Sequence, residues 1–227
     1  MLEDNIWTDD LWIDGEGIRK MRMFFKNFCK EFAEYSLQYH RRLGEFPFIY
    51  NEKSVNSVVL PALMNTGKKT FVFMEHPFKK EDGTQRFLDF YVHNEDNLYL
   101  IELKHGWNSE RTNGITQSVL SKWEKAHEQI NDLTNKSITQ LCNEGYYKNV
   151  FKIALLIMPV YSQRTADFNL AQKYCNELRK NMEENRANWF GVWKINEHNK
   201  YEHEFKNGEK QFYPYVSFIV YQEKIEF

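Results

Sequence analysis

The sequence has few of the residues that define several specialised protein classes. Its 227 residues include 3 Cys, 5 Pro and 10 Gly. An odd number of widely spaced cysteines fits neither a disulfide scaffold nor a zinc ribbon, which need paired cysteines, so we expect all three to be buried. The low content of proline and glycine excludes collagen-like and low-complexity chains.

Long apolar runs and a strong net charge are also missing. Residues 153–160 form the longest buried-looking apolar run, far short of the roughly 20 residues that span a bilayer. The first 17 residues are acidic and lack the cationic and apolar regions of a signal peptide. A net charge of −2 disfavours bulk electrostatic binding of nucleic acid or anionic lipid but leaves room for a local basic groove. We therefore expect a soluble, cytoplasmic protein with no membrane partner.

Aromatic and apolar residues are plentiful and regularly spaced. Phe, Tyr and Trp make up 16% of the chain and apolar residues 42%, which is enough for one substantial core. Apolar spacings of three and four predict helices at residues 18–43, 51–64, 115–142 and 167–182. Pro61 should kink the second helix or end it early. Aromatic and β-branched runs predict strands at residues 70–78, 87–93, 98–105, 150–158, 189–195 and 213–221.

This order of elements predicts an α/β (α+β) fold in which helices flank a central mixed sheet. The first three strands are joined by short turns, which favours an antiparallel meander. The apolar run at residues 150–158 is typical of a strand covered on both faces. We expect a single domain over residues 1–227, with an N-terminal helical extension at 1–45, a central core at 51–158, and a helix with closing strands at 165–227.

Two carboxylates stand out on the second and third predicted strands. Asp89 is followed, after twelve residues, by Glu102-Leu103-Lys104. If residues 94–97 form the turn, His93 pairs with Leu98, and Asp89 then lies opposite Glu102 on one face. The same count places Phe87 opposite Lys104.

A divalent cation would explain this acidic pair. Like charges on opposed strands are destabilising, and Glu102 lies within an apolar run where an unpaired charge is costly. Mg²⁺ favours one or two carboxylates together with water and phosphate oxygens, and Lys104 can hold a water or offset charge on a phosphate. Two alternatives stay open: the pair faces solvent with Lys104 as a cross-strand partner, or the hairpin slips by one residue and moves Asp89 to the other face.

This motif resembles the core of the PD-(D/E)XK nuclease superfamily, which has the restriction-endonuclease-like fold. The matching residues are Asp89, Glu102, Leu103 and Lys104, and they lie on adjacent predicted strands between two helices. The resemblance covers about residues 51–158, and Leu88 stands where the family name has Pro. It implies a metal-dependent nuclease that hydrolyses phosphodiester bonds, with DNA favoured over RNA. Mg²⁺ would be the cofactor, with Mn²⁺ as a substitute, held by Asp89, Glu102 and the Leu103 backbone carbonyl, while Lys104 positions the attacking water.

The resemblance also suggests supporting residues. Glu52 matches a glutamate that assists many members, and it is preferred to Glu75, which lies on the first predicted strand beside Pro77. An acid at a helix N-terminus also favours the helix dipole, which is the alternative for Glu52. The helix after the third strand offers Gln117, Lys122 and Gln129, for which a solvated face is the alternative. Basic residues of the first hairpin are candidates for binding the nucleic-acid backbone: Lys79, Lys80 and Arg86. A nuclease-like module that binds nucleic acid or protein without cleavage is the alternative function, and homodimerisation stays open.

Overall fold

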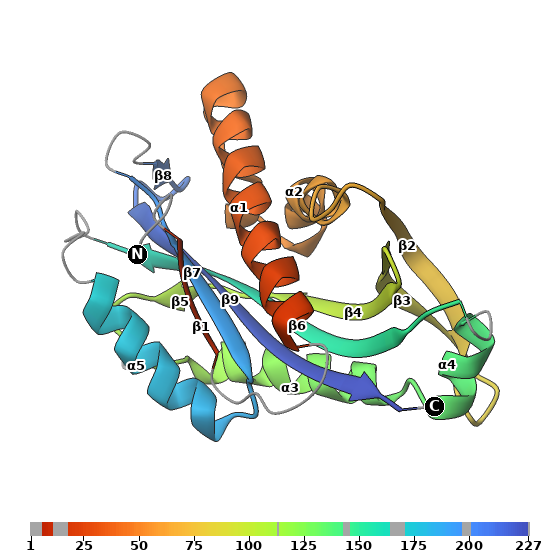
Figure 1. Cartoon of the computed structure of the whole chain (residues 1–227). Coiled ribbons are helices and arrows are strands. Elements are labelled where there is room, and N and C mark those ends of the chain that lie inside the picture. Colours follow the sequence, from red (N-terminus) through yellow and green to blue (C-terminus); the bar gives the residue numbers. More distant parts are fainter. Residues whose placement is uncertain are drawn as a thin grey trace.

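The computed structural model describes residues 6–10, 18–112, 114–142, 146–163, 171–196 and 201–226. Within these ranges, nine strands form one mixed sheet with helices on both faces (Figure 1). The predicted combination of a mixed central sheet and flanking helices is therefore confirmed. No helix in the described ranges is both long and apolar enough to span a membrane.

The sheet places the predicted meander at one end. Its strand order is β1 (Ile6–Asp10), β7 (Trp189–Lys194), β9 (Lys210–Ile225), β6 (Asn149–Ser162), β4 (Asn97–His105), β3 (Gln85–Asn94) and β2 (Thr70–Lys79). Strands β2, β3 and β4 are antiparallel neighbours as predicted, and β4 then runs parallel to β6. The short strands β5 (Asn108–Ser109) and β8 (Glu202–Glu204) pair with β6 and β9. Strand β6 is buried along almost its whole length, as expected for a strand covered on both faces.

Helices cover the two faces of the sheet in separate groups (Figure 1). On one face lie α1 (Ile18–Leu43), the 3₁₀ helix η2 (Pro47–Ile49) and α2 (Glu52–Met64). On the other lie α3 (Gln117–Asn131), α4 (Asn135–Leu141) and α5 (Ala171–Glu184). Helix α1 has the predicted bounds, and its aromatic residues, among them Phe25, Phe28 and Phe32, are buried in the core. Within the predicted N-terminal extension, helix α1 is thus packed on the sheet.

Two helix predictions need correction. The single helix expected at residues 115–142 is divided, because Thr134 caps a new helix by accepting a hydrogen bond at Oγ1 from the Ser137 backbone N–H at 3.3 Å. Helix α2 continues through Pro61 to Met64, so the early end that was one of the two expected effects of this proline does not occur. The proline removes one backbone donor, but burial of Ala62 and Leu63 in the core favours continuation of the helix.

Other elements differ from the sequence analysis in smaller ways. Strands β1 and β5 were not predicted, and β1 lies in the acidic N-terminal segment, where it pairs with β7. The polar stretch after β7 includes β8, which forms a hairpin arm with β9. The predicted helix start at residue 167 lies outside the described residues. Cys29 and Cys175 are buried as expected, whereas Cys142 is only partly buried.

Candidate active site

The β3–β4 hairpin opens at the predicted acidic pair. His93 pairs with Leu98 as predicted, which excludes the register slip, and the ladder runs back to Phe90 and Ile101, where it ends. The predicted ladder pairs of Asp89 with Glu102 and of Phe87 with Lys104 are therefore absent from the ladder between these strands. The Leu103 backbone N–H instead donates to Asp89 Oδ2 at 2.7 Å. A side-chain carboxylate thus replaces a backbone acceptor, and β3 separates from β4 while it stays paired with β2.

Asp89, Glu102 and Lys104 converge at this opening. The Lys104 Nζ donates to the Leu103 carbonyl oxygen at 2.8 Å, and it lies 3.8 Å from Asp89 Oδ2 and 3.9 Å from Glu102 Oε2. The Glu102 side chain is only 4% exposed, so the interpretation as a solvent-facing pair is wrong for this residue. The ammonium group therefore lies among the three oxygen-bearing groups that were predicted to bind a metal ion.

The environment of Glu102 opposes a bare negative charge. Desolvation by burial and the neighbouring Asp89 carboxylate raise the pKa of Glu102 to about 9, although the Lys104 ammonium acts in the opposite direction. A carboxyl group in such a site holds its proton at neutral pH unless a stronger cation binds. Binding of a metal cation by Glu102 would therefore displace the proton of its carboxyl group.

The end of β4 is held from both sides at His105. Its backbone N–H donates to Glu52 Oε2 at 3.2 Å, and its carbonyl accepts from Lys122 Nζ at 2.6 Å. The Lys122 Nζ also lies over the Trp107 ring, 5.0 Å from the ring centroid. Glycine at position 106 leaves space for the lysine side chain, because a Cβ there would lie 3.1 Å from the Lys122 Cδ. Burial raises the pKa of Glu52 and lowers that of Lys122. Both predicted residues thus reach the end of the strand that carries Lys104.

The remaining predicted substrate-binding residues lie apart from this convergence. Lys79 and Arg86 are exposed at the outer end of the β2–β3 hairpin. Lys80 Nζ is paired with Asp132 Oδ1 of the α3 C-terminus at 2.7 Å. Gln129 is exposed on α3, about two helical turns beyond the lysine that reaches β4.

Glu75 lies beside the site although the sequence analysis preferred Glu52. The β2–β3 register places it across from Asp89, and its backbone has φ = 54°. Its carboxylate also contributes to the raised pKa of Glu102. A left-handed conformation costs a residue with a Cβ roughly 1–2 kcal/mol, and such strain often occurs at functional sites. The sequence feature that could have identified Glu75 as a site residue is an acidic side chain within a predicted strand rich in aromatic and β-branched residues.

We expect Glu75→Gly to give a folded protein that is more stable by up to about 1 kcal/mol and, if the predicted nuclease activity is present, to slow cleavage several-fold. Glycine adopts positive φ without a Cβ clash, whereas the substitution removes a carboxylate near Glu102. Glu95→Gly is the matched control, because Glu95 has φ = 53° in the β3–β4 turn. Urea unfolding and cleavage rates measure the two effects. A Glu75→Gly protein with full activity would remove Glu75 from the site.

The donor set fits a hard divalent cation. Within the described ranges, no three His, Cys, Asp or Glu side chains form a group that could hold a metal ion. The predicted set, however, needs only the carboxylates of Asp89 and Glu102 and the Leu103 carbonyl, because Mg²⁺ usually keeps several waters and takes substrate phosphate oxygens. These three oxygen donors suit Mg²⁺ if the Lys104 ammonium moves from its present position.

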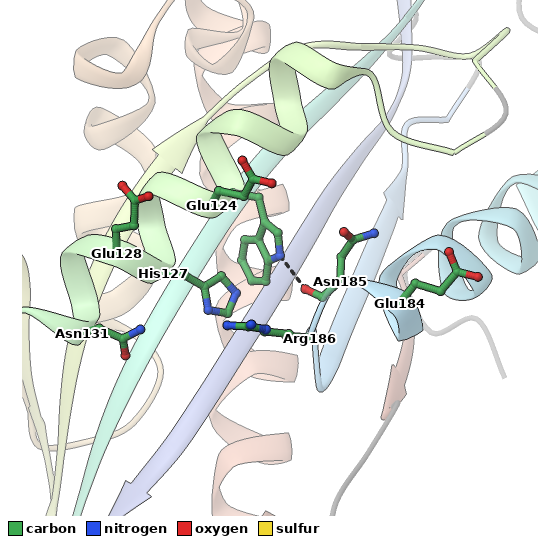
Figure 2. Close-up of a pocket in the computed structure, with 8 residues that line it drawn as sticks. Glu124, His127, Glu128, Asn131, Glu184, Asn185 and Arg186 are labelled. Atoms are coloured by element: carbon green, nitrogen blue, oxygen red, sulfur yellow. Dashed lines mark hydrogen bonds between the residues drawn. The ribbon is translucent and has the colours of Figure 1, made fainter.

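A separate pocket of about 330 Å³ lies between α3 and the turn after α5 (Figure 2). Trp123 Nε1 donates across it to the Asn185 carbonyl at 2.8 Å. His127 is only 8% exposed, and its Nε2 has no hydrogen-bond partner among the described residues. The lining contains none of the predicted site residues: Trp123, Glu124, His127, Glu128, Asn131, Glu184, Asn185 and Arg186. This pocket is therefore distinct from the convergence at Lys104.

We expect His127 to make the protein sensitive to acid. Burial lowers the pKa of His127 to about 4 from its ordinary 6.5. Between these values the unfolded state binds more protons, so stability should fall as the pH drops from 6.5 towards 4. His127→Phe should reduce this loss in urea unfolding at pH 7 and pH 5, and His203→Phe is the control. An unchanged acid dependence in His127→Phe would contradict the assignment.

No protein-family model, curated protein or solved structure matches this chain. The functional conclusion therefore rests on the residues of the site itself. These are two carboxylates, one backbone carbonyl and one lysine at the open end of a hairpin, supported by Glu52 and Lys122.

Proposed function

We propose that this protein is a metal-dependent nuclease with a PD-(D/E)XK-like site, and that it hydrolyses phosphodiester bonds in DNA. The observation that carries the proposal is the place of the Lys104 ammonium, 2.8 Å from the Leu103 carbonyl and 3.8–3.9 Å from the two carboxylates. A position surrounded by these oxygens stabilises positive charge, which is the property that a divalent cation needs.

In this proposal Asp89, Glu102 and the Leu103 carbonyl would hold Mg²⁺, or Mn²⁺ in its place. The ion would supply Lewis-acid chemistry that polarises a phosphate oxygen and activates water. Lys104 leaves the carboxylates, orients the attacking water and offsets the charge that develops on the phosphate. The water oxygen forms a bond to phosphorus as the bond to the leaving oxygen breaks, which gives a phosphate monoester and a hydroxyl group.

Glu52 and Lys122 act as positioning residues in this proposal. Their hydrogen bonds to the two sides of the His105 backbone support the orientation of the strand end that carries Leu103 and Lys104. Small errors in the position of a catalytic group are costly, because the reacting atoms must be aligned. Loss of either bond should therefore lower the rate without removing a metal ligand.

Incubation of the purified protein with supercoiled plasmid, single-stranded DNA and RNA tests the proposal. We expect cleavage of DNA in Mg²⁺ or Mn²⁺ and none in EDTA, with activity restored when metal is added back. The absence of metal-dependent cleavage of all three substrates would overturn the proposal.

A second candidate is a nuclease-like module that binds nucleic acid or protein without cleavage. The same lysine contact favours it, because the Lys104 ammonium already lies beside the Asp89 carboxylate and the Leu103 carbonyl without a metal. Calorimetric titration with Mg²⁺ separates the two candidates. An enzyme should take up the ion at this pair, whereas an inert module has no need to do so.

A further inference from the structure

A surface of aromatic side chains lies beside the candidate active site. It comes from β2, β3 and the segment before β6, and its members, called here the aromatic surface, are Phe71, Phe73, His76, Tyr91, His93, Tyr146 and Tyr147. Phe71, Phe73 and Tyr146 are 68%, 55% and 61% exposed. Such exposure is unusual for large apolar rings, and several of them grouped together mark an interaction site.

The rings of this surface contact one another in sequence. Phe71 stacks on His93 with centroids 5.9 Å apart, and His76 stacks on Tyr91 at 4.8 Å. Phe73 lies 4.9 Å from the His76 ring. Tyr147 connects the two pairs through its ring contact with His93 and its hydroxyl contact with Tyr91. The rings are therefore oriented by their neighbours before any ligand binds, which lowers the entropic cost of binding.

Tyrosine hydroxyl groups fix the border of the surface. The hydroxyls of Tyr91 and Tyr147 lie 2.7 Å apart, and the Tyr91 hydroxyl also donates to the Leu141 carbonyl at 3.3 Å. Tyr146 and Tyr147 contact His93 from this side, with centroids 5.5 and 5.4 Å away. The hydroxyl groups of Tyr91 and Tyr147 are thus paired at the border, while the side chains of Phe71 and Phe73 stay largely exposed.

The aromatic surface is continuous with the candidate active site. Tyr91 is two residues from Asp89 along β3, and Asp89 Oδ2 lies 3.8 Å from Lys104 Nζ. Tyr91 pairs with Leu100, which is two residues before Glu102 on the same face of β4. A chain bound with one phosphate at Asp89 and Lys104 would therefore extend its neighbouring nucleotides over the rings.

Charge and edge geometry favour a nucleic acid over a second copy of this chain. Exposed Lys68 and Lys69 precede β2, and exposed Lys79 is its last residue, so cations lie at both ends of the surface. Strand β2 is an edge strand, but the left-handed Glu75 and the missing N–H of Pro77 interrupt the hydrogen-bonding edge that another strand would need.

From these observations we infer that the aromatic surface binds single-stranded nucleic acid by stacking unpaired bases on Phe71 and Phe73. Bases in a duplex are already stacked and cannot lie on these rings, whereas every unpaired base presents a flat face. The inference rests on the proposed function and deepens it, because it names single strands or unpaired regions as the substrate class.

Fluorescence anisotropy with labelled single strands of about 12 nucleotides tests the inference. EDTA is present, so that binding is measured without cleavage, and the probes are DNA and RNA strands together with an abasic DNA strand of equal length. The variant is Phe71→Ala/Phe73→Ala. Phe205→Ala is the control, since Phe205 is 37% exposed and follows β8, on the opposite side of the molecule from β2 (Figure 1).

We expect the double variant to bind the base-bearing strand at least about tenfold more weakly than the wild type, and Phe205→Ala to bind as the wild type does. On the abasic strand the wild type and the double variant should bind equally. Phe71→Leu/Phe73→Leu keeps apolar side chains without aromatic faces and should also lose affinity. Thermal unfolding should confirm that all variants are folded, because both rings are exposed.

Two results would overturn the inference. One is equal affinity of the wild type and the folded double variant for the base-bearing strand. The other is a double variant that converts a dimer to a monomer with unchanged affinity, which would assign the surface to a second copy. These failures are distinct from failure of the proposed function: base-dependent binding without metal-dependent cleavage removes the nuclease alone, and cleavage with unchanged binding in the variant removes the stacking alone.

Discussion

Lys104→Ala should slow metal-dependent cleavage by at least about a hundredfold and should leave the fold intact. Groups that move protons or stabilise charge in the transition state typically contribute about 10²–10⁴ to the rate. The Lys104 ammonium is the cation that lies within 4 Å of both Asp89 and Glu102 in this site. Its removal also frees the three oxygens that it now contacts, so the variant should bind Mg²⁺ at least as tightly as the wild type.

This combination of lost rate and retained metal binding separates a catalytic lysine from a structural one. Initial rates on single-stranded DNA and calorimetric titration with Mg²⁺ measure the two quantities on the same preparations. Lys53→Ala is the matched control, because Lys53 is an exposed lysine on α2. A Lys104→Ala protein with wild-type rates would contradict the role, and so would one that loses metal binding and rate together.

Glu102→Gln should abolish metal binding and cleavage, yet it should stabilise the metal-free protein at alkaline pH. The pKa of Glu102 is raised from 4.5 to about 9, chiefly by burial. The folded state therefore binds more protons than the unfolded state between these values, and stability should fall as the pH rises through this range. Glutamine has the shape of the protonated acid and does not titrate, so the variant should lack this decline.

Urea unfolding in EDTA at pH 6 and pH 8.5 measures the effect. We expect the variant to exceed the wild type by more than about 1 kcal/mol at the higher pH, since one pKa unit corresponds to about 1.4 kcal/mol. Glu128→Gln, at an exposed position of α3, is the control. A parallel loss of stability in wild type and Glu102→Gln would show that another group causes the decline.

Much of the fold follows from local patterns in the sequence. The aromatic stripe of residues 18–43 specifies α1, because apolar residues at spacings of three and four form one face. The turn at residues 94–97 sets the pairing of His93 with Leu98, and this register brings Asp89 near Glu102 although their predicted ladder pair does not form. The division between α3 and α4 was missed, because the Thr134 cap competes locally with helix continuation in a stretch whose apolar spacing persists.

The sequence predicted only those site residues that neighbouring strands bring together. Asp89, Glu102 and Lys104 come together as expected, but the opening of the hairpin depends on the hydrogen bond from Leu103 to Asp89, which strand alternation does not specify. The His105 contacts join α2, α3 and β4, and such long-range meetings have no local signal. Glu75 was set aside because it lies on the first strand beside Pro77, and its positive φ has no signal in residue type.

The most direct test of a divalent-cation site at Asp89, Glu102 and Leu103 is a titration with Mn²⁺ followed by electron paramagnetic resonance. Free Mn²⁺ gives a signal that decreases when the ion binds, so the number of sites is counted without any substrate. We predict about one bound ion per chain in the wild type and none in Asp89→Asn at the same concentrations. No binding by the wild type, or equal binding by Asp89→Asn, would contradict the proposed metal site.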